Sequence, residues 1–240
     1  LSIDSMTRLA VKKGAQLVCL PEYYSLLEQN DEAYFRDGFS QKDHPALAHG
    51  IDLAEELGIW MSLGSMPIKG PQGKIYNRSF IISPEGRLEA TYDKIHLFDV
   101  EIKDGHKYAE SEIVCPGTTA VVADTPWGLI GLSICYDVRF PQLYRILASA
   151  GAKFLVVPAA FTHKTGKAHW HTLLRARAIE TGSFVFAAAQ CGTRDWGRRT
   201  FGHSLIVDPW GRVLEDGGAE EGVVVSEINT EEVDDARRKI

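Results

Sequence analysis

Four short segments of this chain are apolar at almost every position: residues 17–20, 129–134, 154–157 and 184–189. A strand with one face in water alternates apolar and polar residues, whereas a strand without that alternation needs cover on both faces. The segments are short, and most have proline or glycine close to an end, which favours strands over helices. They therefore predict an α/β protein whose sheets lie between other layers of structure.

The two halves of the chain repeat one order of elements. Residues 17–21, Leu-Val-Cys-Leu-Pro, are similar to residues 155–158, Leu-Val-Val-Pro, and each segment precedes a predicted helix, strand and hairpin. The hairpin turns also match, as Ser-Pro-Glu-Gly-Arg at 83–87 and Asp-Pro-Trp-Gly-Arg at 208–212. Pro-X-Gly is common turn chemistry, but the shared order of four elements favours a pseudo-repeat. It predicts two β-sheets packed face to face, with helices outside.

Periodicity and turn residues place the remaining elements. Residues 45–57 have helical spacing and end before Gly58, a residue type that commonly follows a helix. Further helices are expected at about 141–150 and 168–181. Hairpins are expected at 79–92 and 204–215, a last strand at 222–228, and a long polar loop at 95–117. Loops of that length inside a compact domain are often functional.

Charge and composition argue against several kinds of partner. The net charge of −6 disfavours a nucleic-acid partner, and no apolar run approaches the roughly 18 residues that cross a membrane. The four cysteines form no CxxC pair, so reduced thiols in a cytoplasmic protein are expected. Residues 1–240 are expected to form a single domain. Because the chain starts without Met on a helical pattern, a first strand and a C-terminal tail are expected to be missing.

Cys135 is the strongest nucleophile candidate, because it follows an apolar strand and precedes a helix. Such a strand-to-helix elbow exposes a nucleophile on a sharp turn. A helix N-terminus also favours a thiolate. The alternative is a buried, inert cysteine, which is the commonest state of a free cysteine. Cys19 is expected in the core, and Cys115 and Cys191 border loops.

Glu22 and Lys94 each follow a predicted strand, where active sites of α/β proteins gather. A carboxylate in a partly dry place has a raised pKa, so Glu22 is expected to act as a base near neutral pH. The ammonium of Lys94 can bind an oxyanion as a point charge. Taken alone, each residue fits a solvated surface side chain better than a catalytic one.

Three segments together resemble the signature blocks of the nitrilase, or carbon–nitrogen hydrolase, superfamily. They are Leu-Pro-Glu at 20–22, Tyr-Asp-Lys-Ile-His-Leu-Phe at 92–98 and Ile-Cys-Tyr-Asp-Val-Arg-Phe-Pro at 134–141. Their order, glutamate then lysine then cysteine, is also that of the superfamily. The similarity continues through residues 168–170, 175–180 and 202–204. The resemblance implies an α/β fold of the α-β-β-α four-layer sandwich type, with two face-to-face mixed sheets and outer helices.

The resemblance also implies roles for the site residues. Glu22 is then the base, Cys135 attacks the amide carbon, and Lys94 and the backbone N–H of Tyr136 hold the oxyanion. Glu110 matches a second glutamate of the family that orients Lys94 or the substrate. A solvent-facing glutamate on a long loop is the alternative for Glu110. With these roles, we expect a reaction that uses no cofactor and no metal.

The substrate is expected to be a small anionic amide. Tyr-Asp after the cysteine resembles the amidase branch that includes omega-amidase and deaminated glutathione amidase, and residues 175–181 and 187–192 are closer to the latter. Arg139, His169 and Arg194 are the candidate substrate-binding residues. The guanidinium groups of the two arginines can bind a carboxylate bidentately. Arg139 could instead pair with Asp137, and Arg175 with Glu180.

Two other kinds of protein compete with this interpretation. His163, His169 and His171 could bind a metal with Cys191, but their spacing fits no standard zinc pattern, and His169 and His171 point apart on a helix. A catalytically inactive binding module is the second rival. The superfamily also pairs across the helices after Cys135 and at 168–181, so a homodimer or a higher homo-oligomer is expected.

Overall fold

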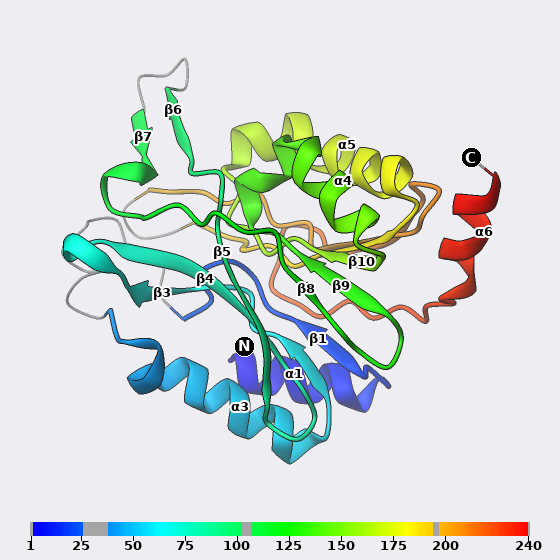
Figure 1. Cartoon of the computed structure of the whole chain (residues 1–240), viewed down its shortest axis with the longest axis horizontal. Helices are drawn as coiled ribbons and strands as arrows, with labels where there is room; N and C mark the ends of the chain where they lie inside the picture. Colours follow the sequence, from blue (N-terminus) through cyan, green and yellow to red (C-terminus); the bar gives the residue numbers. More distant parts are fainter. Residues whose placement is uncertain (1, 26–37, 102–106, 194–196, 240) are drawn as a thin grey trace.

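The computed structural model describes residues 2–25, 38–101, 107–193 and 197–239. Two β-sheets lie one over the other, with helices α1 and α3 outside one sheet and α4 and α5 outside the other (Figure 1). This is the predicted α-β-β-α sandwich, and the predicted fold is confirmed.

The first sheet comes from the N-terminal half. Within the described residues its order is β1 (Leu17–Cys19), β2 (Trp60–Ser62), β4 (Ile75–Ile82) and β3 (Met66–Lys69), and β5 (Leu88–Asp93) also pairs with β4. Strands β1 and β2 run parallel, and the β4–β5 hairpin is antiparallel. The sheet is therefore mixed, as predicted.

The second sheet repeats that pattern. Its order in the described chain is β13 (Val213–Asp216), β12 (Leu205–Val207), β11 (Phe184–Ala187), β10 (Ala152–Val156), β9 (Leu129–Leu132) and β8 (Val122–Ala123). Strands β10 and β11 are parallel like β1 and β2, and β12 and β13 form an antiparallel hairpin like β4 and β5. This agreement supports the pseudo-repeat that the sequence predicts.

The helices cover the outer faces of the two sheets. Helices α1 (Ile3–Lys12) and α3 (Pro45–Leu57) pack on each other, and α3 lies on β2 and β4. Pro45 fits the first turn of α3, and Gly58 ends it in the left-handed conformation, so this helix matches its predicted bounds. Helices α4 (Pro141–Ser149) and α5 (His163–Thr181) cover the second sheet, and α6 (Glu231–Lys239) follows the last hairpin.

Two clusters of buried apolar side chains hold the layers of the sandwich together. One joins the facing sides of both sheets and continues under α4 and α5, with Trp60, Leu132 and Phe154 among its members. The other lies between the first sheet and its helices and includes Leu53, Met61 and Phe80. Each sheet is thus covered on both faces, which explains why its inner strands are apolar at nearly every position.

Three local predictions were wrong. Residues 222–228 form no strand, although all of them are described. The segment 95–117 is not a plain loop, because β6 (Asp99–Glu101) pairs with β7 (Lys107–Ala109) and a 3₁₀ turn (Glu110–Glu112) follows. Helix α5 begins at His163, five residues before its predicted start at 168.

Candidate active site

Cys135 stands at the turn between β9 and a short 3₁₀ helix (Cys135–Arg139). Its backbone has a φ of 49°, a left-handed conformation that is uncommon for a side chain other than glycine. The Cys135 N–H donates to the carbonyl of Pro158 at 2.9 Å, which joins the turn to the segment that follows β10. The predicted strand-to-helix elbow is therefore present, with Cys135 8% exposed.

Glu22 follows β1 and is buried between the two sheets. Its Oε1 accepts hydrogen bonds from Asn77 Nδ2 at 2.9 Å and from Lys94 Nζ at 3.0 Å. Its Oε2 accepts from the backbone N–H of Ala160, just after β10, at 2.8 Å. The Cys135 thiol and this carboxylate also interact, since each contributes to the pKa shift of the other. Glu22 thus connects residues from both sheets and contacts the candidate nucleophile.

Lys94 lies between two carboxylates. Besides Glu22, its Nζ donates to both oxygens of Glu110, at 3.0 and 2.8 Å. Glu110 is fixed in turn by the backbone N–H of Phe98, at 2.7 Å. Lys94 is only 2% exposed, so the ammonium is held by charge partners rather than by water. The structure brings Glu22, Lys94, Glu110 and Cys135 into one cluster.

Two glycines allow the backbone to pack behind this cluster. At Gly64, whose φ is 54°, a Cβ atom would lie 2.0 Å from the carbonyl oxygen of Pro21, next to Glu22. At Gly117 a Cβ atom would lie 2.1 Å from the carbonyl oxygen of Asp93, and the Gly117 N–H donates to Lys94 O at 2.8 Å. Only glycine fits such approaches, so both positions help to place catalytic candidates.

The electrostatic environment fixes the resting charges. Burial, and then the charge of Glu22, raises the pKa of Cys135 well above its ordinary value, so the thiol is protonated at neutral pH. Burial alone would raise the pKa of Glu22, but Lys94, Cys135 and Asn77 outweigh it and lower that pKa. Burial would likewise lower the pKa of Lys94, but Glu110 and Glu22 raise it well above the ordinary value.

These directions overturn two expectations. Glu22 was expected to have a raised pKa, but the adjacent ammonium of Lys94 reverses the effect of burial. Cys135 was expected to favour the thiolate, but its helix is a 3₁₀ segment of five residues, and burial beside a carboxylate dominates. At rest the site therefore pairs an ionised carboxylate with a neutral thiol, so the proton has to leave the sulfur as the attack occurs.

Asp137 and Asn77 are site residues that the sequence did not reveal. Asp137 is fully buried and accepts from the N–H of Ile134 at 2.8 Å, from Tyr92 Oη at 2.7 Å and from the backbone N–H of His96 at 3.0 Å. It thereby joins the nucleophile turn to β5, the strand that directly precedes Lys94, and to the loop after it. Asn77 stands between Tyr76 and Arg78 in β4, so no local pattern in the sequence marked it as a buried site residue.

Of the three candidate substrate-binding residues, two lie near the cluster and one lies outside the described residues. Arg139 lies over the rings of Tyr136 and Phe161, at 5.7 and 5.5 Å, and its Nη2 is 3.2 Å from His169 Nδ1. Arg139 and His169 are thus adjacent, beside the residue that follows the nucleophile. Arg194 lies outside the described residues. Arg198, which was not among the three, donates to Ala160 O at 3.2 Å, next to the N–H that binds Glu22.

The alternative arginine pairings were wrong. Asp137 binds Tyr92 and His96 rather than Arg139. Glu180 pairs with Arg177 at 2.8 Å, and Arg175 donates to the carbonyl of Gly211 at 2.7 Å. Arg175 and Arg177 therefore hold helix α5 to its neighbours and do not contact the cluster.

The rival metal site is not assembled as the sequence suggested. Among the described residues, the set of possible ligands that comes together is His171, His203 and Asp216, without His163, His169 or Cys191. His169 and His171 point apart, as predicted, because one contacts Arg139 and the other contacts Asp216.

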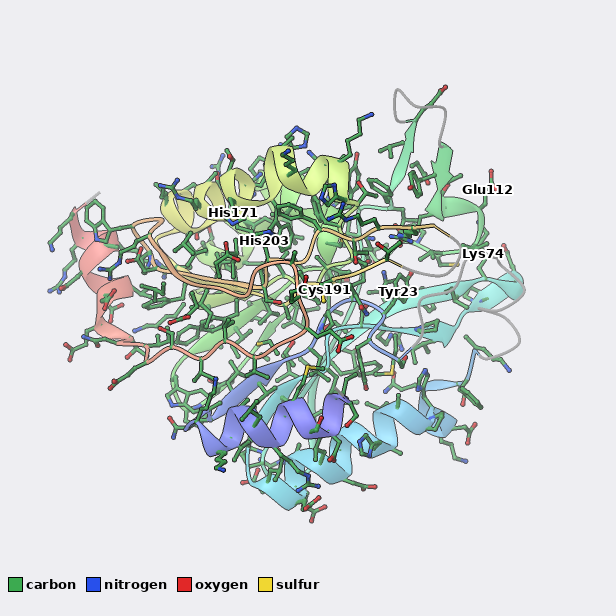
Figure 2. The ribbon with its side chains drawn as sticks, turned by 180° about the vertical axis from the view of Figure 1, so that it is seen from behind. Tyr23, Lys74, Glu112, His171, Cys191 and His203 are labelled. Carbon is green, nitrogen blue, oxygen red and sulfur yellow. The ribbon has the colours of Figure 1, made fainter. Side chains whose placement is uncertain are left out.

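A cavity of about 1040 Å³ lies between α1, β1 and residues 220–228. It reaches Tyr23 and Cys191, which Figure 2 labels near the middle of the molecule. Its lining includes none of Glu22, Lys94 and Cys135. Because the chemistry lies in the buried cluster, we place the candidate active site there and not in this cavity.

The sequence pattern of the family described as carbon-nitrogen hydrolase matches residues 1–238. The chain belongs to the carbon–nitrogen hydrolase family. A deaminated glutathione amidase from Synechocystis sp. is 41% identical over 246 residues, covering 99% of this chain and 88% of that protein.

Solved structures agree with this assignment. The crystal structure of the Caenorhabditis elegans NitFhit protein matches with a TM-score of 0.91 and 38% identity, over 99% of this chain. This chain spans 58% of that longer protein. An amidase variant from Nesterenkonia sp., with acrylamide added at its active-site cysteine, matches with a TM-score of 0.82 and 26% identity, over 99% of this chain and 89% of that one.

Family and fold together establish the class of reaction. The protein is a hydrolase that acts on carbon–nitrogen bonds of amides. Within the described residues, no helix combines the length and the apolar character that crossing a membrane requires.

Proposed function

We propose that this protein hydrolyses a small anionic amide to a carboxylic acid and ammonia, through a thioester on Cys135. One observation carries the proposal: the buried Glu22 carboxylate binds Lys94 and also acts on the Cys135 thiol, whose pKa is raised by burial and by the charge of Glu22. Nucleophile, base and cation therefore meet at one point, as cysteine catalysis requires. The deaminated glutathione amidases among its relatives support an amide of that class.

In the first half-reaction, Glu22 takes the proton from Cys135 Sγ as the sulfur attacks the amide carbon. The carbonyl oxygen becomes an oxyanion. The Nζ of Lys94 and the backbone N–H of Tyr136 stabilise it, and within the described residues that N–H donates to no other acceptor. Glu22 then returns the proton to the amide nitrogen. The carbon–nitrogen bond breaks, ammonia leaves, and the acyl group stays on sulfur.

In the second half-reaction, Glu22 takes a proton from water, and the resulting hydroxide attacks the thioester carbon. The same two donors hold the second oxyanion. When the carbon–sulfur bond breaks, the proton on Glu22 returns to Cys135 Sγ and the carboxylic acid is released. Glu110 keeps Lys94 in position through both halves, since it holds the ammonium with two hydrogen bonds. These residues supply every group the reaction needs, so the proposal involves no cofactor.

Two guanidinium groups support an anionic substrate. Arg139 is held beside Tyr136, and Arg198 is bonded to Ala160 O, so the arginines approach the cluster from two different segments. An arginine can bind a substrate carboxylate with two parallel hydrogen bonds. His169 contacts Arg139 and would hold it in place. Arg194 remains a third candidate from the sequence.

A substrate panel tests this proposal. We expect the highest kcat/KM for deaminated glutathione, a lower value for α-ketoglutaramate, and the lowest for a neutral aliphatic amide. Losing a charged anchor costs about 2–5 kcal/mol. Arg139→Gln or Arg198→Gln should therefore lower kcat/KM for the anionic amide by roughly 30-fold or more, and leave the neutral amide nearly unchanged.

Arg87→Gln is the matched control, because Arg87 lies in the β4–β5 turn with its side chain 65% exposed. It should leave both activities unchanged. A wild-type preference for the neutral amide would refute the anionic pocket. A preference for α-ketoglutaramate would keep the pocket and assign the protein to omega-amidase.

We also propose that residues 1–240 act as one cytoplasmic domain that forms a homodimer or a higher homo-oligomer. Four free cysteines support a reducing compartment. Ile146 on α4 and Ile179 on α5 are large apolar side chains that are 56% and 46% exposed. Because α4 and α5 pack on each other, these residues support pairing across that layer.

A further inference from the structure

Three side chains that could bind a metal ion meet on the outer side of the second sheet. His171 comes from the middle of α5, His203 from the segment before β12, and Asp216 from the end of β13. Figure 2 shows the two histidines next to each other beneath α5. Their ring nitrogens and the carboxylate oxygen all lie within 4.8 Å of one another.

The spacing of these atoms fits a single ion. His171 Nε2 is 3.0 Å from Asp216 Oδ2, and His203 Nδ1 is 3.1 Å from the same oxygen. Two ligands of a tetrahedral zinc ion lie about 3.3 Å apart, given zinc–ligand distances of about 2.0–2.1 Å. The two separations that involve Asp216 are therefore already close to those of ligands on one ion. Only the two imidazoles need to approach each other.

The surrounding residues hold these ligands in place. His203 has a φ of 58°, which is rare for a non-glycine residue, and its backbone N–H donates to Gly218 O at 2.6 Å. The N–H of Gly218 donates to Asp216 Oδ1 at 2.9 Å, which fixes the carboxylate. The ring of Phe201 stacks on His203 at 4.3 Å. Such supporting contacts orient metal ligands.

We propose that His171, His203 and Asp216 form a binding site for Zn²⁺ or a chemically similar divalent transition-metal ion. Two imidazoles and one carboxylate are a donor set that suits such ions, and water would complete the coordination. The side chains of His171 and Asp216 are each 36% exposed, so an ion can reach them from solvent.

The role of this site is structural. It joins α5 to the β12–β13 hairpin, and its three side chains contact none of Glu22, Lys94 and Cys135. Bound metal would thus fasten the outer helix layer to the edge of the second sheet. The inference stands independently of the proposed amidase substrate.

Titration of the chelator-stripped, tag-free protein with Co²⁺ and with Zn²⁺ tests the proposal. We expect one ion per chain, visible Co²⁺ absorption typical of a protein site, and a Tm that rises by about 5–10 °C at a hundredfold excess of Zn²⁺ over Kd. His171→Gln and Asp216→Asn should each weaken binding by about tenfold or more. Circular dichroism checks that both variants are folded.

His163→Gln is the matched control. His163 lies on the same helix and its ring also meets Phe201, at 6.0 Å, but it is not part of the group. This variant should bind metal like the wild type. The proposal is overturned if the wild type binds no stoichiometric ion, which would leave a hydrogen-bonded histidine–aspartate cluster only. Equal binding by wild type and His171→Gln would overturn it as well.

Discussion

The pKa of Glu22 is lowered, and those of Lys94 and Cys135 are raised. At neutral pH Glu22 is therefore ionised, Lys94 is a cation and Cys135 is a neutral thiol. The pKa of Glu22 lies below its ordinary 4.5, so its contribution to stability is present above pH 4.5 and is lost as the pH falls through the lower, folded value. The pKa of Lys94 lies above its ordinary 10.5, so its contribution is present below pH 10.5 and is lost as the pH rises through the higher, folded value.

These directions predict a broad pH profile. Glu22 should stay ionised down to below 4.5, and Cys135 should stay a thiol up to above its ordinary 9.0. We therefore expect kcat/KM to be flat between those two pH values, with circular dichroism confirming the fold at each point. An acid limb centred above pH 6 would show that Glu22 is not the base in the state described.

Glu110 provides a second prediction at the residue scale. Glu110→Gln removes one of the two charges that hold Lys94, and a misplaced catalytic group can reduce the rate by about a hundredfold. We expect kcat to fall by about tenfold to a hundredfold, with a smaller change in KM. Glu112→Gln, in the same turn but exposed, is the control. If the two variants had the same kcat, Glu110 would have no positioning role.

The structure brings together the main residues that the sequence singled out, but the charge states of two of them differ from the prediction. Lys94 lies 72 positions from Glu22 in the chain, so the reversal of the Glu22 pKa depends on a contact that only folding creates. Asp137 was missed for a similar reason, since its partners Tyr92 and His96 come from a distant strand and loop. Local sequence patterns therefore predict which residues are buried better than they predict which charged side chains come into contact.

At the scale of elements, the site depends on strand ends that meet between the sheets. Strands β1, β5, β9 and β10 each end just before a residue of the cluster or its support. Hairpins and capped helices were predicted well because their signals are local, as in α3 with its Pro45 and Gly58. The strand expected at 222–228 was wrong, because a strand needs a hydrogen-bonded neighbour and, within the described chain, these residues pair with no strand of either sheet.

A substitution at Gly117 tests whether the backbone at the end of β5 positions Lys94. In Gly117→Ala the new Cβ would lie 2.1 Å from Asp93 O, so the backbone next to Lys94 has to move. We expect a loss of about 1–3 kcal/mol in unfolding free energy and a fall in kcat of about tenfold or more. Gly222→Ala is the control, because its Cβ meets nothing within 4 Å. Unchanged kcat in folded Gly117→Ala would show that this close approach does not position Lys94.

At the scale of the whole molecule, the outer layer of α4 and α5 is the expected pairing surface. Ile146→Glu places a charge on that layer, and light scattering should then show a smaller assembly than for the wild type. Leu88→Glu is the control, since Leu88 is an exposed apolar residue on β5, outside the α4–α5 layer. A wild type that is strictly monomeric at micromolar concentration would contradict the proposed assembly.

The central claim is that catalysis passes through an acyl group on Cys135. Segments that follow strands of both sheets contribute to the cluster around the thiol. The most direct measurement is the intact mass of the protein, quenched in acid during turnover of an amide substrate. We predict an adduct equal to the substrate minus ammonia, located on Cys135, and neither adduct nor turnover in a folded Cys135→Ala variant. Turnover by Cys135→Ala at the wild-type rate would contradict the account.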